Sequence, residues 1–181
     1  MPNANVPDFI GKNFDQICFV VEDLDEAKAF WGRALGIEHW SSALDLAKEQ
    51  TEKEYMGKPG EFEFSCLYGA VGPMLVELAR PDGGENVYKD WLEENGPGLH
   101  HVGFLLADEE EYDRASGVFV DEGIVKVMGA FAELPGGACR WSYWDTRETL
   151  GVYTELYYLD GEALVGMDRL KAGEIMNLTG V

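Results

Sequence analysis

The sequence predicts an α+β fold built from two copies of one unit, because three features of the chain occur twice in the same order. A β-rich run at residues 14–23 recurs at residues 99–108, with Gln16 of the first run matching His101 of the second. Each run is followed by an amphipathic helical pattern, and then by strand-like segments that end in the same way. Each unit is therefore predicted to contain a strand, a helix and roughly three further strands.

A helix is predicted after each β-rich run. Asp23 and Asp108 are each followed three residues later by a glutamate, which is the pattern of a helix N-terminus. The apolar residues that follow recur with the three-and-four spacing of an amphipathic helix. Each apolar stripe ends at a glycine, Gly36 or Gly123, which suits a left-handed residue at the helix C-terminus.

The two units also end alike. Glu77 lies in a predicted strand at residues 73–79, and Glu155 lies in one at residues 152–159. Each glutamate is followed five residues later by the aspartate of an Asp-Gly pair. Further strands are predicted before these, at residues 61–68 and 140–145.

These repeats divide the chain into four segments. The first unit takes residues 12–80, a linker with a short helix takes residues 81–97, and the second unit takes residues 98–160. A C-terminal extension at residues 161–181 matches neither unit. Its apolar stripe predicts a short helix that packs on the body of the protein or on a second chain.

The charge of the chain excludes some partners. The 181 residues include 34 Asp and Glu against 14 Lys and Arg, a formal net charge of −20. Such a surface disfavours nucleic acid and anionic membranes, which need Lys and Arg. No apolar run reaches the length of about 20 residues that a membrane helix needs. Residues 1–8 lack the basic start and apolar core of a signal peptide, and the three cysteines show no paired framework, so we expect a cytoplasmic protein with free thiols.

Four polar residues occupy equivalent places in the two units: Gln16, Glu77, His101 and Glu155. A glutamate in the middle of an apolar strand needs a partner or water, since an unpaired buried carboxylate is very costly. Two interpretations fit this pattern. The four residues converge on one divalent ion such as Zn²⁺, Ni²⁺, Co²⁺, Mn²⁺ or Fe²⁺, or each of them faces solvent. His100 is expected on the face opposite His101, as a packing or surface residue, because a strand alternates its faces.

Motifs across about residues 14–159 resemble the vicinal oxygen chelate superfamily of glyoxalases, methylmalonyl-CoA epimerases, extradiol dioxygenases and bleomycin-resistance proteins. The motifs are Phe14-Asp15-Gln16-Ile17, the helix at residues 23–36, Val76-Glu77-Leu78, Gly98-Leu99-His100-His101-Val102 and Thr154-Glu155-Leu156. The resemblance implies two βαβββ modules whose curled mixed sheets surround a metal-binding cup. It also implies that Gln16, Glu77, His101 and Glu155 hold one divalent ion.

Within the superfamily, the ligand set is similar to that of zinc-dependent glyoxalase I, and residues 87–104 look most like methylmalonyl-CoA epimerase. The resemblance implies a metal-dependent isomerase, epimerase or lyase that removes a proton next to a chelated carbonyl and forms an enediolate. Glu155, and after it Glu77, would be the catalytic base. The few cations and many aromatic residues favour an apolar or aromatic carbonyl substrate, with glutathione or coenzyme A adducts as further options. The resemblance also implies a homodimer.

Two other functions fit the same fold. One is a metal-free protein that binds or sequesters small molecules. The other is an iron-dependent extradiol dioxygenase, which Gln16 disfavours because those enzymes carry histidine in that place.

Overall fold

The computed structural model describes residues 9–37, 39–41, 44–45, 50–134 and 137–174. Its strands are β1 (Phe14–Val20), β2 (Leu44–Asp45), β3 (Gln50–Tyr55), β4 (Lys58–Pro59), β5 (Phe62–Val71), β6 (Met74–Gly84), β7 (Gly98–Leu106), β8 (Lys126–Leu134), β9 (Gly137–Trp144) and β10 (Tyr153–Leu159). Its helices are α1 (Phe9–Lys12), α2 (Leu24–Leu35), α3 (Val87–Asn95), α4 (Glu109–Asp121), α5 (Arg147–Leu150) and α6 (Gly161–Lys171). The expected absence of a signal peptide concerns residues 1–8, which lie outside this part of the chain, as do residues 175–181 of the predicted extension.

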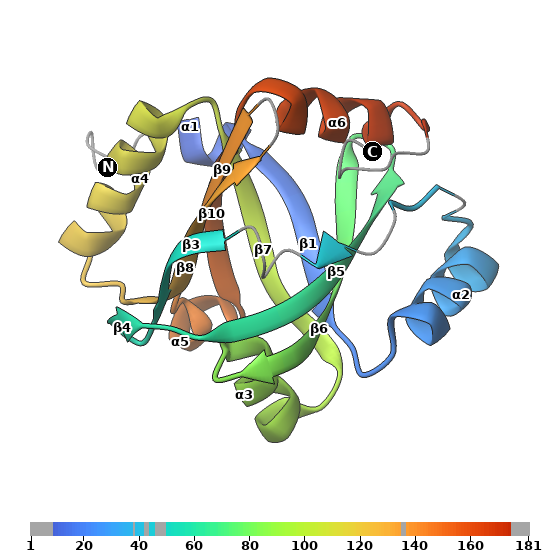
Figure 1. Cartoon of the computed structure of the whole chain (residues 1–181), viewed down its shortest axis with the longest axis horizontal. Helices are drawn as coiled ribbons and strands as arrows, with labels where there is room; N and C mark the ends of the chain where they lie inside the picture. Colours follow the sequence, from blue (N-terminus) through green and yellow to red (C-terminus); the bar gives the residue numbers. More distant parts are fainter. Residues whose placement is uncertain (1–8, 38, 42–43, 46–49, 135–136, 175–181) are drawn as a thin grey trace.

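In the described part of the chain the strands form one ten-stranded mixed sheet in the order β2-β5-β6-β1-β7-β10-β9-β8-β3-β4. The first strands of the two units, β1 and β7, lie side by side and antiparallel at its centre. Each is flanked by the last strand of its own unit in parallel, β6 beside β1 and β10 beside β7. The sheet curls, and its helices lie around the outside and the ends (Figure 1). The predicted α+β fold of two related units around a curled mixed sheet is thus confirmed.

The two predicted helices cover the convex face of the sheet, one for each unit (Figure 1). The side chain of Asp23 accepts a hydrogen bond at the start of α2, and that of Asp108 does the same at the start of α4. Gly36 ends α2 in the left-handed region, as predicted, with φ of 71°. Each helix packs part of its apolar stripe against outward-facing strand residues such as Leu78 under α2 and Leu156 under α4, while Leu35 at the end of α2 is exposed.

One element departs from the predicted plan. The hairpin β3-β4 precedes β5 in the first unit, yet β3 pairs with β8 of the second unit at the far edge of the sheet. Apart from its hairpin partner β4, strand β3 of the first unit therefore pairs with a strand of the second unit and not with the other strands of its own unit. This pairing joins segments more than 70 residues apart, as in Gln50 opposite Ala132, and no local pattern encodes it.

The concave face holds the main core, and two helices close its ends. Tyr88 of α3 is fully buried in this core at one end. At the other end, α6 lies across the sheet (Figure 1) and buries Met167 and Leu170 in the same core. The helix of the C-terminal extension, α6, therefore packs on the body of its own chain. Lys171 at the end of α6 also forms an ion pair with Asp15 of β1.

Two of the three cysteines, Cys18 and Cys66, are buried free thiols as expected, and Cys139 is a half-buried free thiol. No helix of the described residues is both long and apolar enough to span a membrane.

We predict that Leu170→Ala lowers the free energy of unfolding by about 2–5 kcal/mol, because it removes a fully buried side chain from the core. Val165→Ala on the same helix is the control, since Val165 is 56% exposed, and should change stability by less than about 0.5 kcal/mol. Urea unfolding of both variants measures the difference. Equal effects would show that α6 does not stabilise the fold by packing on the core.

Candidate metal centre

Four neighbouring strands carry the four residues that the repeat singled out. Glu77 lies on β6, Gln16 on β1, His101 on β7 and Glu155 on β10. The register places Gln16 and Glu155 on either side of Gly103. Two residues further along β1, the register places Glu77 and His101 on either side of Cys18. The side chains therefore form two adjacent rows on the concave face, because residues two apart on a strand share a face.

The four side chains contact one another within a single chain. His101 Nε2 lies 3.3 Å from Glu77 Oε2 and 3.3 Å from Glu155 Oε2. The Gln16 amide nitrogen donates to Glu77 Oε2 at 3.2 Å and also to Glu155 Oε2, and it lies 3.4 Å from His101 Nε2. All four residues are buried, with Glu155 the most exposed at 6%. Two come from each unit, so the two halves of the chain meet at this cluster.

The cluster buries two carboxyl groups together with one imidazole. Burial raises the pKa of Glu155, Glu77 raises it further, and His101 opposes the rise. Burial by itself lowers the pKa of His101, but the adjacent Cys18, Glu155 and Glu77 raise it well above its ordinary value. Even a protonated His101 balances only one of two buried carboxylates. A buried uncompensated charge is costly, so the cluster favours a bound cation or a bound proton.

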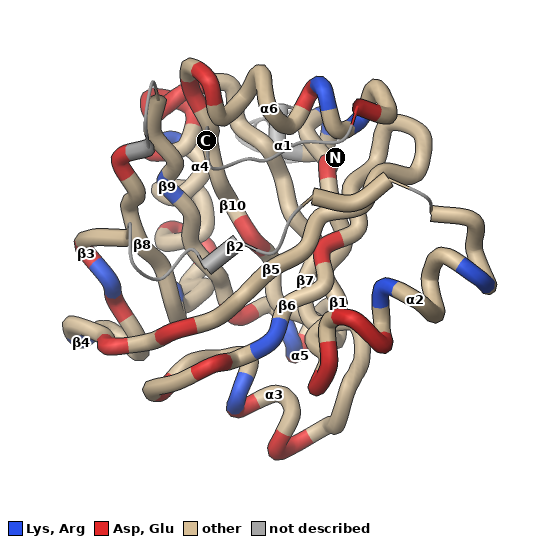
Figure 2. The backbone as a smooth tube through the Cα atoms, turned by 45° about the vertical axis from the view of Figure 1, so that its right-hand side comes forward, with Lys and Arg blue, Asp and Glu red and all other residues tan. Residues whose placement is uncertain are grey.

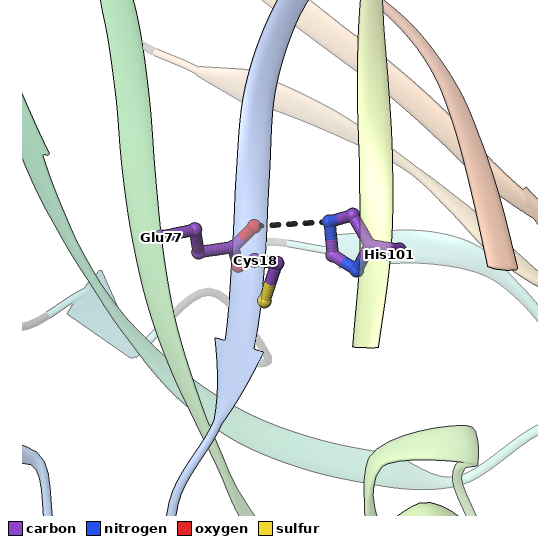
Figure 3. Close-up of side chains that lie close together, drawn as sticks. All are labelled: Cys18, Glu77 and His101. Atoms are coloured by element: carbon purple, nitrogen blue, oxygen red, sulfur yellow. Dashed lines mark ion pairs between the residues drawn. The ribbon is translucent and has the colours of Figure 1, made fainter. Parts of the chain in front are cut away.

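Two cysteines that the repeat does not predict as site residues border the cluster. A nitrogen of His101, an oxygen of Glu77 and the sulfur of Cys18 lie within 4.8 Å of one another, a group that could hold a metal ion (Figure 3). The Cys66 thiol donates to Glu77 Oε1 at 2.8 Å. Burial, with Glu77 adding to it, raises the pKa of Cys18 to about 12. The signal for Cys18 was present in the sequence, because it lies two residues from Gln16 and so shares its face.

Strand alternation predicted that His100 lies on the face opposite His101. This prediction is wrong. The Nδ1 atom of His100 lies 2.9 Å from His101 Nδ1, and His100 is fully buried. The reason is an irregularity in the ladder between β1 and β7, where Cys18 pairs with His101 but Phe19 pairs with Leu99. His100 is the extra residue of this bulge, and a bulge re-aims side chains. Burial also lowers the pKa of His100 well below its ordinary value.

The donor set fits a divalent ion. Carboxylate oxygens and imidazole nitrogen are common ligands of Zn²⁺ and other first-row metals, and a thiolate suits the softer ones among them. With both carboxyl groups ionised, the cluster would carry the negative charge that a divalent cation neutralises. In the structure the Gln16 amide presents its nitrogen to the carboxylates. Rotation of the amide by half a turn would present its oxygen to the same place, and the two orientations are nearly alike in shape.

Aromatic side chains pack in the core on the concave face, next to the cluster. The ring of Tyr143 lies 4.6 Å from that of His101, centre to centre. Trp141 packs on Tyr143 at 5.0 Å, and Tyr88 lies 5.7 Å from Tyr143. The indole nitrogen of Trp141 is buried and makes no hydrogen bond in the described part of the chain. The interior thus combines a polar centre with an aromatic wall that carries one unsatisfied donor.

The sequence-family model of the Glyoxalase/Bleomycin resistance protein/Dioxygenase superfamily matches residues 15–140 of the chain. The chain belongs to this superfamily. The match starts one residue before Gln16 and contains Glu77 and His101, whereas Glu155 lies beyond its end. No curated protein matches the sequence.

Solved structures share the superfamily fold. A hypothetical protein from Bacillus halodurans is similar with a TM-score of 0.58 at 16% identity, over 80% of this chain and 92% of its own. Methylmalonyl-CoA epimerase from Mycobacterium tuberculosis is similar with a TM-score of 0.56 at 16% identity, over 90% of this chain and 99% of its own. At 16% identity, these two similarities show that the chain shares the fold of these proteins, and nothing more.

We predict that Gly103→Ala displaces Gln16 and lowers the free energy of unfolding by about 1–3 kcal/mol. A methyl group at Gly103 would lie 2.4 Å from Gln16 Cγ, which is too close for the present conformation. Gly98→Ala on the same strand is the control, because a methyl group there meets nothing within 4 Å. Thermal unfolding and the side-chain amide signal of Gln16 in NMR spectra measure both effects. Equal stability and an unshifted amide signal in Gly103→Ala would contradict the close packing of Gln16 on β7.

Proposed function

We propose that this protein is a divalent-metal-dependent isomerase, epimerase or lyase that removes a proton next to the carbonyl group of a small molecule. The observation that carries the proposal is the convergence of Gln16, Glu77, His101 and Glu155 in one buried cluster of a single chain. Superfamily membership supports it, because the superfamily includes glyoxalases. In this proposal these four residues hold one ion of Zn, Ni, Co, Mn or Fe.

A divalent ion held there would supply Lewis acidity that stabilises negative charge on the carbonyl oxygen. The chain itself supplies the base. Glu77 is anchored at both oxygens, by Cys66 at Oε1 and by Gln16 and His101 at Oε2. Among the contacts of the described residues, Glu155 is held through Oε2 alone, and burial raises its pKa. A carboxylate that is less constrained, and whose pKa is raised, is well suited to take a proton, so Glu155 is the base in this proposal and Glu77 the second choice.

The surroundings of the cluster favour an apolar or aromatic substrate. Tyr88, Trp141 and Tyr143 pack against one another in the core beside the cluster, and the buried indole nitrogen of Trp141 has no hydrogen-bond partner among the described residues. Arg140 and Arg147 are already engaged by carboxylates. In the described part of the chain, Asp and Glu outnumber Lys and Arg along the backbone (Figure 2). This charge distribution disfavours the phosphate groups of coenzyme A, although the epimerase with a similar fold is named for a coenzyme A ester.

A second function, metal-free binding of small molecules, is favoured by one observation. The four polar side chains already satisfy one another by hydrogen bonds, with the Gln16 amide bridging Glu77 and Glu155. Such a network needs no ion if one of the carboxylates is protonated. The superfamily contains bleomycin-resistance proteins as well as enzymes.

We predict that Glu155→Gln lowers exchange of substrate C–H hydrogen with deuterated water by about 100-fold or more, because a positioned base contributes at least this much. The assay screens the metal-loaded protein against apolar and aromatic carbonyl compounds by NMR. Elemental analysis of the same samples should show that most of the metal is retained. The exposed residue Glu162 gives the control Glu162→Gln, which should exchange at the wild-type rate. Near wild-type exchange in Glu155→Gln would refute this residue as the base.

A further inference from the structure

We propose that His100 is a positioning residue that fixes the hydrogen of His101 on Nδ1, so that Nε2 is the ring nitrogen that gives up its hydrogen to bind a cation. The inference deepens the proposed function and rests on it for the role of Nε2. The arrangement of hydrogens on the two rings follows from the geometry alone.

The chain of hydrogen bonds begins at a backbone carbonyl. His100 Nε2 lies 3.3 Å from the oxygen of Val87, the first residue of α3. A carbonyl oxygen can only accept, so His100 Nε2 must carry the hydrogen. The His100 ring is fully buried among Tyr88, Trp91 and Tyr153, with ring centres 4.7, 5.4 and 5.0 Å away. No carboxylate of the described residues contacts it, so the ring stays neutral and its Nδ1 has a lone pair.

The same reasoning then fixes His101. The two Nδ1 atoms lie 2.9 Å apart, which is a hydrogen bond in which one nitrogen donates and the other accepts. Because His100 Nδ1 is the acceptor, His101 Nδ1 carries the hydrogen. The remaining nitrogen of His101, Nε2, faces Glu77 and Glu155. Figure 3 shows this nitrogen directed at Glu77.

Without His100 the opposite arrangement would be favoured. Two carboxylate oxygens lie 3.3 Å from His101 Nε2, and both attract a hydrogen to that nitrogen. A neutral ring with its hydrogen on Nε2 cannot donate a lone pair from Nε2 to a cation. The acceptor at Nδ1 offsets this preference, and outer partners of this kind change metal affinity by about 10- to 100-fold. The bulge in β7 is what allows two consecutive histidines to make this contact.

Two variants separate positioning from packing. His100→Asn keeps an oxygen acceptor close to the position of Nδ1 but loses the ring from the aromatic cage. His100→Phe keeps a ring of similar size and loses the acceptor. A purely structural role predicts that His100→Phe binds metal more tightly than His100→Asn. The positioning role predicts the reverse order of metal affinity.

The experiment has two readouts. In the metal-free wild type, long-range ¹H–¹⁵N correlation spectra should show hydrogen on Nε2 alone for His100 and on Nδ1 for His101. The chain has three histidines and the third, His39, is exposed, so the spectrum can be assigned. Titration with Zn²⁺ and Co²⁺ should show affinity about 10- to 100-fold weaker in His100→Phe than in His100→Asn. Thermal unfolding of each variant confirms that it is folded.

Hydrogen on Nδ1 of His100 in the wild type would overturn the proposal. So would equal affinity of the two variants, or weaker binding in folded His100→Asn. If the wild type binds neither ion while the spectra show the expected hydrogens, then the proposed function and the metal role of His100 fail together, and the hydrogen placement stands.

Discussion

The antiparallel pairing of β1 with β7 is the constraint on which the rest of the structure depends. It joins the two units at the centre of the sheet and sets Cys18 opposite His101 and Gln16 opposite Gly103. Because β6 and β10 flank these strands in parallel, Glu77 and Glu155 approach from the two sides on adjacent rows, Glu77 level with Cys18 and Glu155 level with Gly103. One chain therefore assembles all four polar residues, and the register alone brings together side chains up to 139 positions apart.

The second organising feature is the electrostatic state of this cluster. Two carboxylates and one imidazole are buried together under an aromatic wall, and the fold gains little from them unless a cation or a proton balances their charge. The neighbouring contacts fix the orientation of each group in the cluster. Cys66 anchors Glu77, the Gln16 amide bridges the two carboxylates, and His100 holds the far side of the His101 ring. Such mutual orientation is what a binding site requires and what a core built only for stability does not.

Much of the arrangement could be predicted from the sequence, because it depends on local patterns. The capping residue Asp23, the terminating Gly36 and the period of two that puts Gln16 on the inner face are all local signals. Two features could not be predicted. The pairing of β3 with β8 joins distant segments, and the bulge that turns His100 to the inner face comes from a one-residue irregularity in the ladder. Strand alternation gave the wrong face for His100 for this reason.

The most direct test of the account is the metal content of protein purified without chelator or histidine tag, beside the double variant Glu77→Ala/Glu155→Ala. The account predicts about one divalent ion per chain in the wild type and none in the variant, because the variant removes both carboxylates of the cluster. Absence of metal from the wild type, even after incubation with Zn²⁺, Ni²⁺, Co²⁺, Mn²⁺ and Fe²⁺, would contradict it and would leave metal-free binding of small molecules as the function that the fold supports.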